Sequence, residues 1–578
     1  MPMTDKIVGI DFGTSTSEVA VLNQEKPLVI ANHLGEHITP SAVSFSESGE
    51  MIIGKDARDQ LLLQPEDTVI EVKRLMGSDE TVLMQGKKYS PQQVASFILS
   101  YLMDCARNHL GNNVSKAVIT VPAYFSDVQR RAVMEAGKLA GITVERIINE
   151  PTAAALDYGI EHMQECQHLL VYDLGGGTLD VTVLEMFEGI LEVKASAGNN
   201  KLGGKDFDQR LIDYLLKRFA DSHKLEPSAV TKDKRALVRL KEEAEKCKIA
   251  LSEAEEYHLL LTHFAKVKNN PAALEDTITR EIFEGLIKDL IDTTAAPIQS
   301  ALDDAGLKAA DLDLVLLVGG STRIPYVQQF IEQTLGQKPG SLIDPDLAVV
   351  RGAAIQGGII NGELSAGTDI LITDVCPYTL GISVLDVVGG LPVPDAFDTI
   401  IPRNVTIPTV KKKIYGTVVD DQTMVEIKAY QGEFKKASHN NFLGRFMLEG
   451  IPPAPAFKEK VSVSFAYDAN GILQVEGTVL SSGEKANLVI ETNSAEMEEE
   501  VDFSTWDQVP QARKYKAILK KAAELIESGK AGIYAFEMES LVQKIKAGLV
   551  RGEKAKTLNQ YKKELHEIVY ELTEDEDD

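Results

Sequence analysis

Two glycine turns of the same construction constrain the fold of this chain more than any other feature. The first is the segment Gly9–Thr14 (GIDFGT), and the second is the segment Tyr172–Thr178 (YDLGGGT). Each follows an apolar run and precedes an alternating run, which predicts a strand, a turn and a second strand. Glycine lets backbone N–H groups approach phosphate oxygens, and an aspartate at a strand end can hold Mg²⁺ directly or through water. Two such hairpins predict a duplicated fold that grips one nucleotide from both sides.

Either turn alone would also fit a tight turn with an acidic cap, but the pair favours a nucleotide site. Thr14 and Thr178 stand where a hydroxyl can bond phosphate or the water shell of a metal ion. Asp11, Asp173 and Asp180 gather negative charge that a cation would balance.

A third glycine turn, Gly319–Arg323 (GGSTR), lies between an apolar run and the start of a helical pattern. The backbone at Gly319 and Gly320 can pass close to a flat ring or a ribose, and Arg323 can stack on an adenine face. This turn supports a nucleotide site mainly because the two hairpins precede it.

Bulk properties exclude several classes of function. The chain has 578 residues, which predicts several domains, and a formal net charge of −27, which argues against nucleic acid or an anionic membrane surface as a partner. Four widely spaced cysteines (Cys105, Cys166, Cys247 and Cys376) are expected to be buried, reduced thiols. Because no signal-peptide pattern or long apolar stretch is found, we expect a cytoplasmic protein.

Periodicity divides the chain into four parts. Strands alternate with helical patterns over residues 1–368, which is typical of an α/β domain, and an apolar run at 369–375 is a predicted linker. Residues 376–500 have the short strands and turns of a β-sandwich, and residues 501–578 return to helical periodicity before an acidic tail. The helices expected in the first part cover residues 91–110, 127–140, 207–219, 232–251 and 326–335.

Further segments resemble the seventy-kilodalton heat-shock chaperone family, of the DnaK type, over roughly residues 5–495. The matching segments, beyond the three glycine turns, are Glu71–Gly77 (EVKRLMG), Val121–Phe125 (VPAYF), Ile148–Ala155 (INEPTAAA), Leu202–Asp208 (LGGKDFD) and Asn404–Pro408 (NVTIP). Within the family, the segment Asp374–Gly381 (DVCPYTLG) and the short C-terminal part are most similar to the specialised HscC-like branch.

The resemblance implies an architecture and an activity. It implies an α/β nucleotide-binding domain of the actin and sugar-kinase type (1–368), a linker (369–375), a β-sandwich substrate-binding domain (376–500) and a short α-helical lid with an acidic tail (501–578). The implied function is that of an ATP-dependent chaperone that binds extended apolar segments of unfolded client polypeptides, with slow ATP hydrolysis switching its peptide affinity. ATP or ADP and Mg²⁺ are the implied cofactors, with K⁺ left open. A J-domain co-chaperone is an implied partner, and a nucleotide exchange factor is left open.

The resemblance also implies roles in the nucleotide site. Lys73 would reach the γ-phosphate, and Thr178 would line the pocket beside it. Asp11, Glu150 and Asp173 would hold Mg²⁺ and the attacking water, and Asp180 would complete the metal set. The remaining nucleotide-binding residues are Gly13, Thr14, Ser15, Gly175, Gly176, Gly177, Gly203, Gly204, Glu245, Lys248, Ser252, Gly319, Gly320, Ser321, Arg323 and Asp344. Residues 245, 248 and 252 share one helical face, which without the hairpins would fit a solvated charged surface.

Coupling and peptide residues follow from the same resemblance. Pro122 and Arg130 match a proline switch and its partner, although a turn and a solvated helix residue would also fit. Arg146, Asn149 and Asp374 match a surface that J-domain proteins engage. The peptide cleft would comprise Ile382, Leu385, Tyr415, Val418, Val425, Ile427 and Ile472, with Leu385 and Val418 in an arch. All seven could instead be core of the sandwich, especially Ile427 and Ile472.

One position departs from the family pattern. Beside Lys248 the family usually has an arginine that sandwiches adenine against the counterpart of Arg323, and this chain has Ile249 there. We therefore expect faster nucleotide release. Two other classes share the nucleotide fold, small-molecule kinases and actin-like filaments, but neither explains the C-terminal 200 residues or so.

Overall fold

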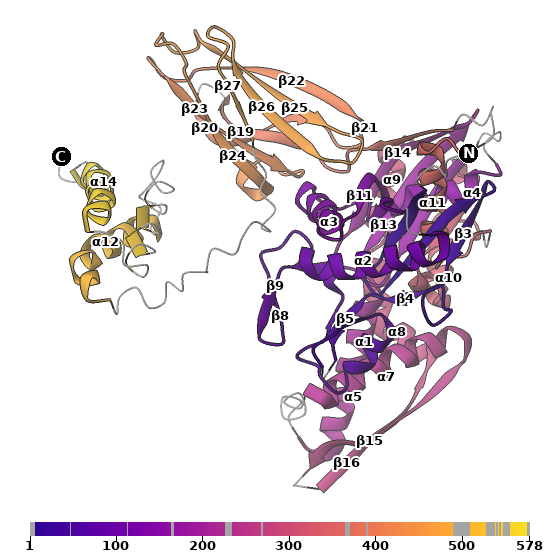
Figure 1. Cartoon of the computed structure of the whole chain (residues 1–578). Coiled ribbons are helices and arrows are strands. Elements are labelled where there is room, and N and C mark those ends of the chain that lie inside the picture. The colour runs from indigo at the N-terminus through magenta and orange to yellow at the C-terminus, as the bar shows by residue number, and fades with distance from the viewer. Residues whose placement is uncertain are drawn as a thin grey trace. The chain divides into compact units, whose positions relative to one another are not determined.

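The computed structural model describes residues 6–574 except 47, 112–113, 163–166, 226–233, 268–269, 341, 365–369, 389–390, 489–508, 528–537, 539–540, 543–544, 547–548 and 550–554. The chain forms two compact units, Met1–Asn493 and Ser494–Asp578 (Figure 1).

The first lobe of the larger unit is built on a sheet with the strand order β11-β10-β1-β2-β3. Strands β1, β2 and β3 are antiparallel neighbours, whereas β10 and β11 run parallel to β1. The strands of this sheet are β1 (Ile7–Phe12), β2 (Thr16–Asn23), β3 (Lys26–Ile30), β4 (Thr39–Pro40), β10 (Lys116–Val121) and β11 (Thr143–Asn149).

The second lobe repeats this arrangement, with the order β17-β12-β13-β14. Its first three strands in sequence are again antiparallel neighbours, and β17 is parallel to β12. The strands are β12 (Gln167–Leu174), β13 (Leu179–Phe187), β14 (Ile190–Asn199) and β17 (Leu314–Val318). The repeat confirms the duplicated fold that the two glycine turns predict.

Smaller elements complete the first lobe. They are β5 (Ala42–Phe45), β6 (Met51–Ile53), α1 (Lys55–Gln60), β7 (Val69–Ile70), the 3₁₀ turn Val72–Leu75, β8 (Val82–Met84), β9 (Lys87–Tyr89), α2 (Pro91–Leu110) and α3 (Asp127–Leu139). Capping boxes begin α2 and α3, because Ser90 pairs with Gln93 and Ser126 pairs with Gln129. Local sequence thus sets where both helices start.

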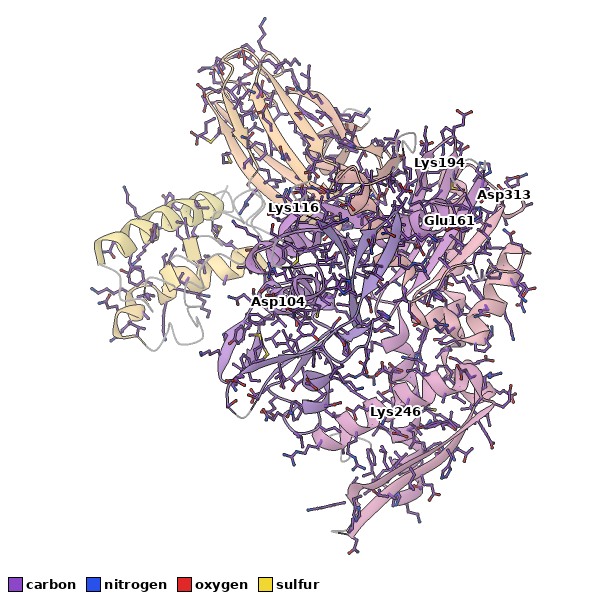
Figure 2. The ribbon with its side chains drawn as sticks, turned by 45° about the vertical axis from the view of Figure 1, so that its right-hand side comes forward. Asp104, Lys116, Glu161, Lys194, Lys246 and Asp313 are labelled. Atoms are coloured by element: carbon purple, nitrogen blue, oxygen red, sulfur yellow. The ribbon has the colours of Figure 1, made fainter. Side chains whose placement is uncertain are left out.

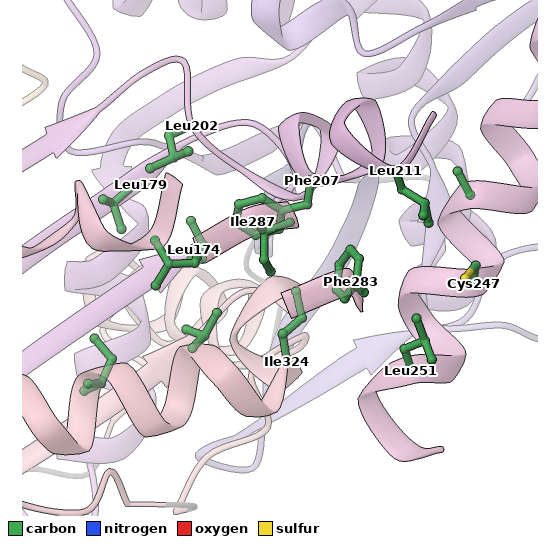
Figure 3. Packing of buried hydrophobic residues seen from close by; sticks show 14 of the residues in the cluster. Leu174, Leu179, Leu202, Phe207, Leu211, Cys247, Leu251, Phe283, Ile287 and Ile324 are labelled. Atoms are coloured by element: carbon green, nitrogen blue, oxygen red, sulfur yellow. The ribbon is translucent and has the colours of Figure 1, made fainter. Parts of the chain in front are cut away.

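An apolar cluster lies beneath the second glycine turn and joins it to the outer helices of the second lobe. Leu174 and Leu179 flank the turn, and Phe207, Phe283 and Ile287 pack in the same cluster (Figure 3). The surrounding elements are α5 (Gly204–His223), α7 (Lys234–Glu253), β15 (Glu256–Val267), β16 (Asn270–Thr279), α8 (Arg280–Asp292), α9 (Ala295–Ala305) and α10 (Pro325–Leu335). The turn therefore rests on a rigid apolar base.

Two central helices pack unusually closely. They are α4 (Glu150–Gly159) and α11 (Ala348–Ile360). A β-carbon on Gly352 of α11 would lie 1.7 Å from the carbonyl oxygen of Ala153 in α4, and one on Gly9 of β1 would lie 2.2 Å from the Ala354 nitrogen. Only glycine fits at both contacts.

The linker is a strand of the second lobe's sheet. Strand β18 (Leu371–Val375) pairs in parallel with β14 through Ile190↔Leu371, Leu191↔Ile372 and Glu192↔Thr373. On its other side β18 pairs with β21 (Thr406–Ile407), which belongs to the following β region. The sheet of the nucleotide lobe and the β region are therefore joined through this strand.

Two four-stranded antiparallel sheets form the β region, as the turn-rich sequence predicts. One has the order β20-β19-β23-β24 and the other β22-β25-β26-β27. Their strands are β19 (Leu380–Val388), β20 (Leu391–Ile401), β22 (Thr409–Gly416), β23 (Met424–Gln431), β24 (Asn441–Glu449), β25 (Lys460–Tyr467), β26 (Leu473–Val479) and β27 (Lys485–Asn487). One apolar cluster contains residues from both sheets, which makes the region a sandwich.

The smaller unit is helical where it is described. It contains the 3₁₀ turn Pro510–Lys514, α12 (Lys516–Glu527) and α14 (Ala555–Glu574). Between them, residues 538, 541, 545 and 549 are helical, and their side chains share one buried cluster with α12 and α14. The helical periodicity predicted for this part is confirmed at these positions.

The structure also shows where charged side chains and the cysteines lie. Exposed charged side chains such as Asp104 and Lys246 lie on the surface of the larger unit (Figure 2). Cys105, Cys247 and Cys376 are buried and free, whereas Cys166 lies outside the described residues. None of the helices described has the length and apolar character needed to cross a membrane.

Candidate nucleotide site

A cleft of about 610 Å³ lies between the two lobes and is lined by all three glycine turns. Most of the residues expected in the nucleotide site line it together. They are Asp11, Gly13, Thr14, Ser15, Lys73, Glu150, Asp173, Gly175, Gly176, Thr178, Gly204, Glu245, Lys248, Ser252, Gly319, Gly320, Ser321 and Arg323. Four others (Gly177, Gly203, Asp180 and Asp344) lie beside this cleft without lining it.

Each hairpin places two carboxylates directly opposite one another. Asp11 on β1 is the cross-strand partner of Glu18 on β2, and Asp173 on β12 is the partner of Asp180 on β13. Like charges opposite one another destabilise a sheet. Two such pairs at equivalent places in a duplicated fold therefore indicate a site that receives positive charge.

Three carboxylates, Asp11, Glu150 and Asp173, line the floor of the cleft, and Asp180 lies beside them as the cross-strand partner of Asp173. These four are hereafter called the floor carboxylates. Burial raises the pKa of each of them, to about 7 for Asp180 and well above the usual range for Asp173. Repulsion from Glu150, Asp180 and Asp11 adds to the effect of burial on the pKa of Asp173. Their ionised forms are thus disfavoured unless a cation approaches.

Lys73 is the cation at the centre of this group. It is only 3% exposed, its ammonium forms an ion pair with Glu150, and it lies 5.9 Å from the ring centre of Phe12 and 5.8 Å from that of Phe125. Its charge acts against the rise in pKa of Asp11 and Glu150. The aromatic rings and the burial hold the ammonium in a fixed place.

The floor carboxylates fit a hydrated divalent cation. The Oδ2 atom of Asp180 is buried and has no hydrogen-bond partner, and carboxylate oxygens are the donors that Mg²⁺ prefers. Across the part of the chain that the structure describes, no three acidic, histidine or cysteine side chains converge to hold one ion directly. A cation here would complete its shell with phosphate oxygens and water.

Glycines make the walls of the cleft close-fitting. A β-carbon on Gly203 would lie 2.4 Å from the nitrogen of Gly177, and one on Gly319 would lie 2.5 Å from the carbonyl oxygen of Leu174. Gly319 also has a φ of 82°, which favours glycine. Gly203 therefore packs directly against the second glycine turn at Gly177.

Helix α7 and the third glycine turn form the opposite wall. Lys248 bonds Asp208 at 2.8 Å, and Ser252 donates to the carbonyl of Lys248. Arg323 is held by Asp346 at 2.6 Å and by Asp344 at 3.3 Å, so Asp344 acts on the wall through Arg323. The charged face of α7 therefore faces the cleft and not open solvent.

Glu245 bridges the two lobes at this wall. It forms an ion pair with Arg58 of α1 and a 3.5 Å pair with Lys205 of α5. Ile249, one turn further along α7, is 62% exposed and lines the mouth of the cleft. Sequence reasoning missed Arg58, because no local motif connects it with a residue 187 positions away.

The coupling residues form a buried network at the linker strand. Asp374 of β18 accepts hydrogen bonds from Asn149 at 2.7 Å and from Thr152 at 3.2 Å. Arg130 donates to Asn149 at 2.7 Å and to the carbonyl of Ala123 at 2.9 Å, in the turn that begins at Pro122. Arg130 is buried, so the alternative of a solvated helix residue is wrong.

Arg146 belongs to the same region. Burial lowers its pKa, while the charge of Asp374 acts in the opposite direction. Its Nε atom is buried without a hydrogen-bond partner. Asn149 and Asp374 are buried as well, so in this structure they are not surface residues.

The residues expected in the peptide cleft divide into core and exposed positions. Ile382 and Ile427 belong to the core of the sandwich, and Tyr415 and Val425 pack against that core. The hydroxyl of Tyr415 also bonds Asp398 at 2.7 Å. Ile472 is buried, whereas Leu385 and Val418 are exposed. Leu385 and Val418 are thus outside the core, and their place in an arch stays a prediction.

Two further residues of the nucleotide site were missed from sequence. Glu18 is buried and lines the cleft, and Thr120 donates to Asp11 at 2.7 Å. Counting residues across the first predicted hairpin would have paired Glu18 with Asp11, since antiparallel partners share one face.

Comparison with known proteins agrees with this geometry. The family model described as Hsp70 protein matches residues 7–83 and 79–577. Proteins named Chaperone protein DnaK from Thermotoga petrophila and Thermotoga neapolitana are each 45% identical to the chain over 541 residues, covering 93% of this chain and 88% of the relative. These matches name no branch within the family, so the HscC-like resemblance stays a prediction.

Proposed function

Because this chain belongs to the Hsp70 family of ATP-hydrolysing chaperones, we propose that its cleft binds Mg-ATP and that hydrolysis there switches the affinity of the sandwich for extended apolar peptides. The nucleotide-binding domain would comprise residues 1–368, the linker 369–375, the sandwich domain 376–500, and the lid with its tail 501–578. Unfolded client polypeptides are the partners that this function requires.

The residues of the cleft have distinct roles in this proposal. Lys73 contacts the γ-phosphate, where a fixed ammonium offsets the charge that spreads over the phosphoryl oxygens. The floor carboxylates orient the attacking water and the water shell of Mg²⁺, and Thr178 lines the pocket beside them. Mg²⁺, when bound, would neutralise phosphate charge. The wall of α7 and the third glycine turn, with Ser321 and Arg323, hold the adenosine.

The linker strand carries the coupling part of the proposal. Strand β18 lies between β14 of the second lobe and β21 of the β region, and its Asp374 reaches the turn at Pro122 through Asn149 and Arg130. The same turn contributes Phe125, whose ring lies against Lys73. A change at the γ-phosphate can therefore bias whether β18 stays paired, which is a two-state switch.

We expect Asp374→Asn to reduce the stimulation of ATP hydrolysis by a short apolar peptide severalfold. Hydrogen bonds to a buried charge contribute roughly 1.5–3 kcal/mol, and the substitution removes the charge that Asn149 and Thr152 stabilise. The measurement is steady-state ATP hydrolysis with increasing peptide. Asp104→Asn, at a 61% exposed surface carboxylate, is the matched control and should respond like the wild type. Equal stimulation in both variants would contradict the coupling role.

The same assay separates the rival classes. A small-molecule kinase would respond to a sugar or an acid instead of a peptide, and an actin-like filament would sediment when ATP is added. A wild-type chain that hydrolyses ATP without any response to apolar peptides would contradict the proposed chaperone cycle.

We expect Ile249→Arg to slow the release of ADP about fivefold, because a guanidinium over a purine contributes roughly 1 kcal/mol. Ile249 lines the mouth of the cleft together with Arg323, so an arginine there would face the same ligand. Stopped-flow dissociation of a fluorescent ADP measures the rate. Leu139→Arg, at an exposed position of α3, introduces the same charge outside the cleft. Equal rates of ADP release from all three proteins would contradict a role of residue 249 in nucleotide release.

The remaining assignments rest on the family relationship. A J-domain protein is the proposed partner at Arg146, Asn149 and Asp374, and an exchange factor and a K⁺ site are left open. A cytoplasmic location is also proposed. The helices of the smaller unit would form a lid over bound peptide.

A further inference from the structure

An exposed phenylalanine of the sandwich has a backbone conformation that favours glycine. Phe457 lies in the loop between β24 and β25, its φ is 64°, and the residue is 64% exposed. Among the residues that the structure describes, it is the one apolar side chain with a positive φ, since the other non-glycine residues of this kind are polar. A bulky side chain in this conformation is strained, and the strain persists only where the surrounding structure fixes the backbone. The chain therefore has a phenylalanine where glycine would fit without strain.

The loop of Phe457 is fixed by the loop that contains a predicted arch residue. This second loop, hereafter the arch loop, covers residues 417–423 between β22 and β23 and contains Val418. Hydrogen bonds connect the two loops: Phe457 N–H to the Thr417 carbonyl at 2.7 Å, Thr417 N–H to the Glu459 carbonyl at 3.2 Å, Asp421 N–H to the Ala454 carbonyl at 2.9 Å, and Ala456 N–H to the Asp420 carboxylate at 2.8 Å. The strained backbone and the arch loop are thus held together.

Packing inside the sandwich does not account for this side chain. Phe457 does not belong to the buried apolar cluster that joins the two sheets. Val418 and Val419 of the arch loop and Met424 at the start of β23 are exposed as well, so the phenylalanine extends an apolar surface along the arch loop. Single exposed apolar side chains are common, but a strained one beside a predicted ligand site indicates a function.

We propose that Phe457 forms an additional subsite for client peptides, next to the arch loop, which binds an aromatic or branched apolar side chain of an extended segment. The inference rests on the proposed function, because it adds a specificity-determining residue to the same peptide site. Every second side chain of an extended peptide points to the same side, so a neighbour of the residue at the arch loop would lie against the ring. The fixed backbone presents the ring with little loss of conformational freedom on binding, and contact with the ring favours apolar partners.

The test is Phe457→Gly in the full chain, with the affinity for short fluorescein-labelled peptides measured in the presence of ADP. Each peptide has a central leucine, polar residues elsewhere and one phenylalanine, which is moved through the remaining positions from peptide to peptide. The variant should bind the peptide with phenylalanine at one of these positions about fivefold more weakly than the wild type does, and the other peptides equally well.

The fold and a matched control are checked alongside. Glycine relieves the strain at a positive φ, so the unfolding temperature of the sandwich in Phe457→Gly should equal or exceed that of the wild type. Phe434→Ala removes a phenylalanine of similar exposure, 62%, from the loop between β23 and β24. This control should bind every peptide as the wild type does.

Three results would overturn the inference. Unchanged affinity of Phe457→Gly for every peptide would mean that no peptide side chain contacts the ring, and an equal loss for all peptides would mean that Phe457 acts on the cleft as a whole. A lower unfolding temperature would mean that the ring serves the fold. All three leave the proposed function intact if the wild type binds the peptides and releases them with ATP, whereas a wild type that binds none of them would overturn the proposed function as well.

Discussion

Replacing Lys73 with methionine will lower the rate of ATP hydrolysis about 10²–10³-fold, the loss typical when one preorganised group that stabilises transition-state charge is removed. Methionine keeps the length of the side chain and its contacts with Phe12 and Phe125 while removing the charge. The ammonium is buried and lies beside the floor carboxylates, so no solvent-exposed cation can replace it at short range.

The fold should survive this substitution. Burial already raises the pKa of Glu150, and Lys73 acts against that rise. Without Lys73 the pKa of Glu150 rises further, so the neutral carboxyl is favoured over an unpaired buried charge. Single-turnover hydrolysis gives the rate, and calorimetric titration with ATP shows whether binding persists. Lys26→Met, at an exposed lysine of β3, is the control, and a Lys73→Met rate within threefold of the wild type would exclude the proposed role.

The second large effect concerns the crossing of α4 and α11. Gly352→Ala should destabilise the nucleotide lobes by about 3 kcal/mol or more, the upper end for overpacking, because the new methyl group meets a backbone oxygen at 1.7 Å. A backbone atom cannot rotate away as a side chain can. The two helices must move apart, which also disturbs Gly9 of β1 against Ala353 and Ala354.

Thermal unfolding followed by calorimetry measures this effect, and the transition of the nucleotide lobes should fall by several degrees. Gly285→Ala is the matched control: Gly285 also lies within a helix, α8, but no atom lies within 4 Å of the added methyl group. Alanine there should stabilise the helix by up to about 1 kcal/mol. If both variants unfold at the wild-type temperature, the contact between α4 and α11 is looser than described.

Much of the nucleotide site follows from local sequence. The hairpins at Asp11 and Asp173 form as their glycines and alternating runs predict, because turn chemistry and period-two burial act over a few residues. Helix α2 has the predicted bounds, Pro91–Leu110, because a capping box marks its start. Helix α5 begins at Gly204, earlier than predicted, because the glycine-rich segment before Phe207 is already helical.

What the sequence could not predict depends on long-range contact. Arg58 and Glu245 lie on different lobes, and Tyr378 meets Tyr124 across 254 positions, so no spacing rule connects them. The sandwich poses a different difficulty, because alternation marks one buried face without saying whether it faces the core or a peptide. Ile427, for example, belongs to the buried apolar cluster of the sandwich, although the family resemblance placed it in the peptide pocket.

The linker strand has a mechanical consequence. Among the described residues, three pairs join β18 to β14 and two more join it to β21. Because so few pairs hold β18, its pairing can open and re-form at a small cost in free energy, without unfolding the sheet of the second lobe or the sandwich. The hydrolysis of one ATP per cycle is then enough to shift the equilibrium between paired and unpaired β18. The protein can repeat this movement many times without unfolding.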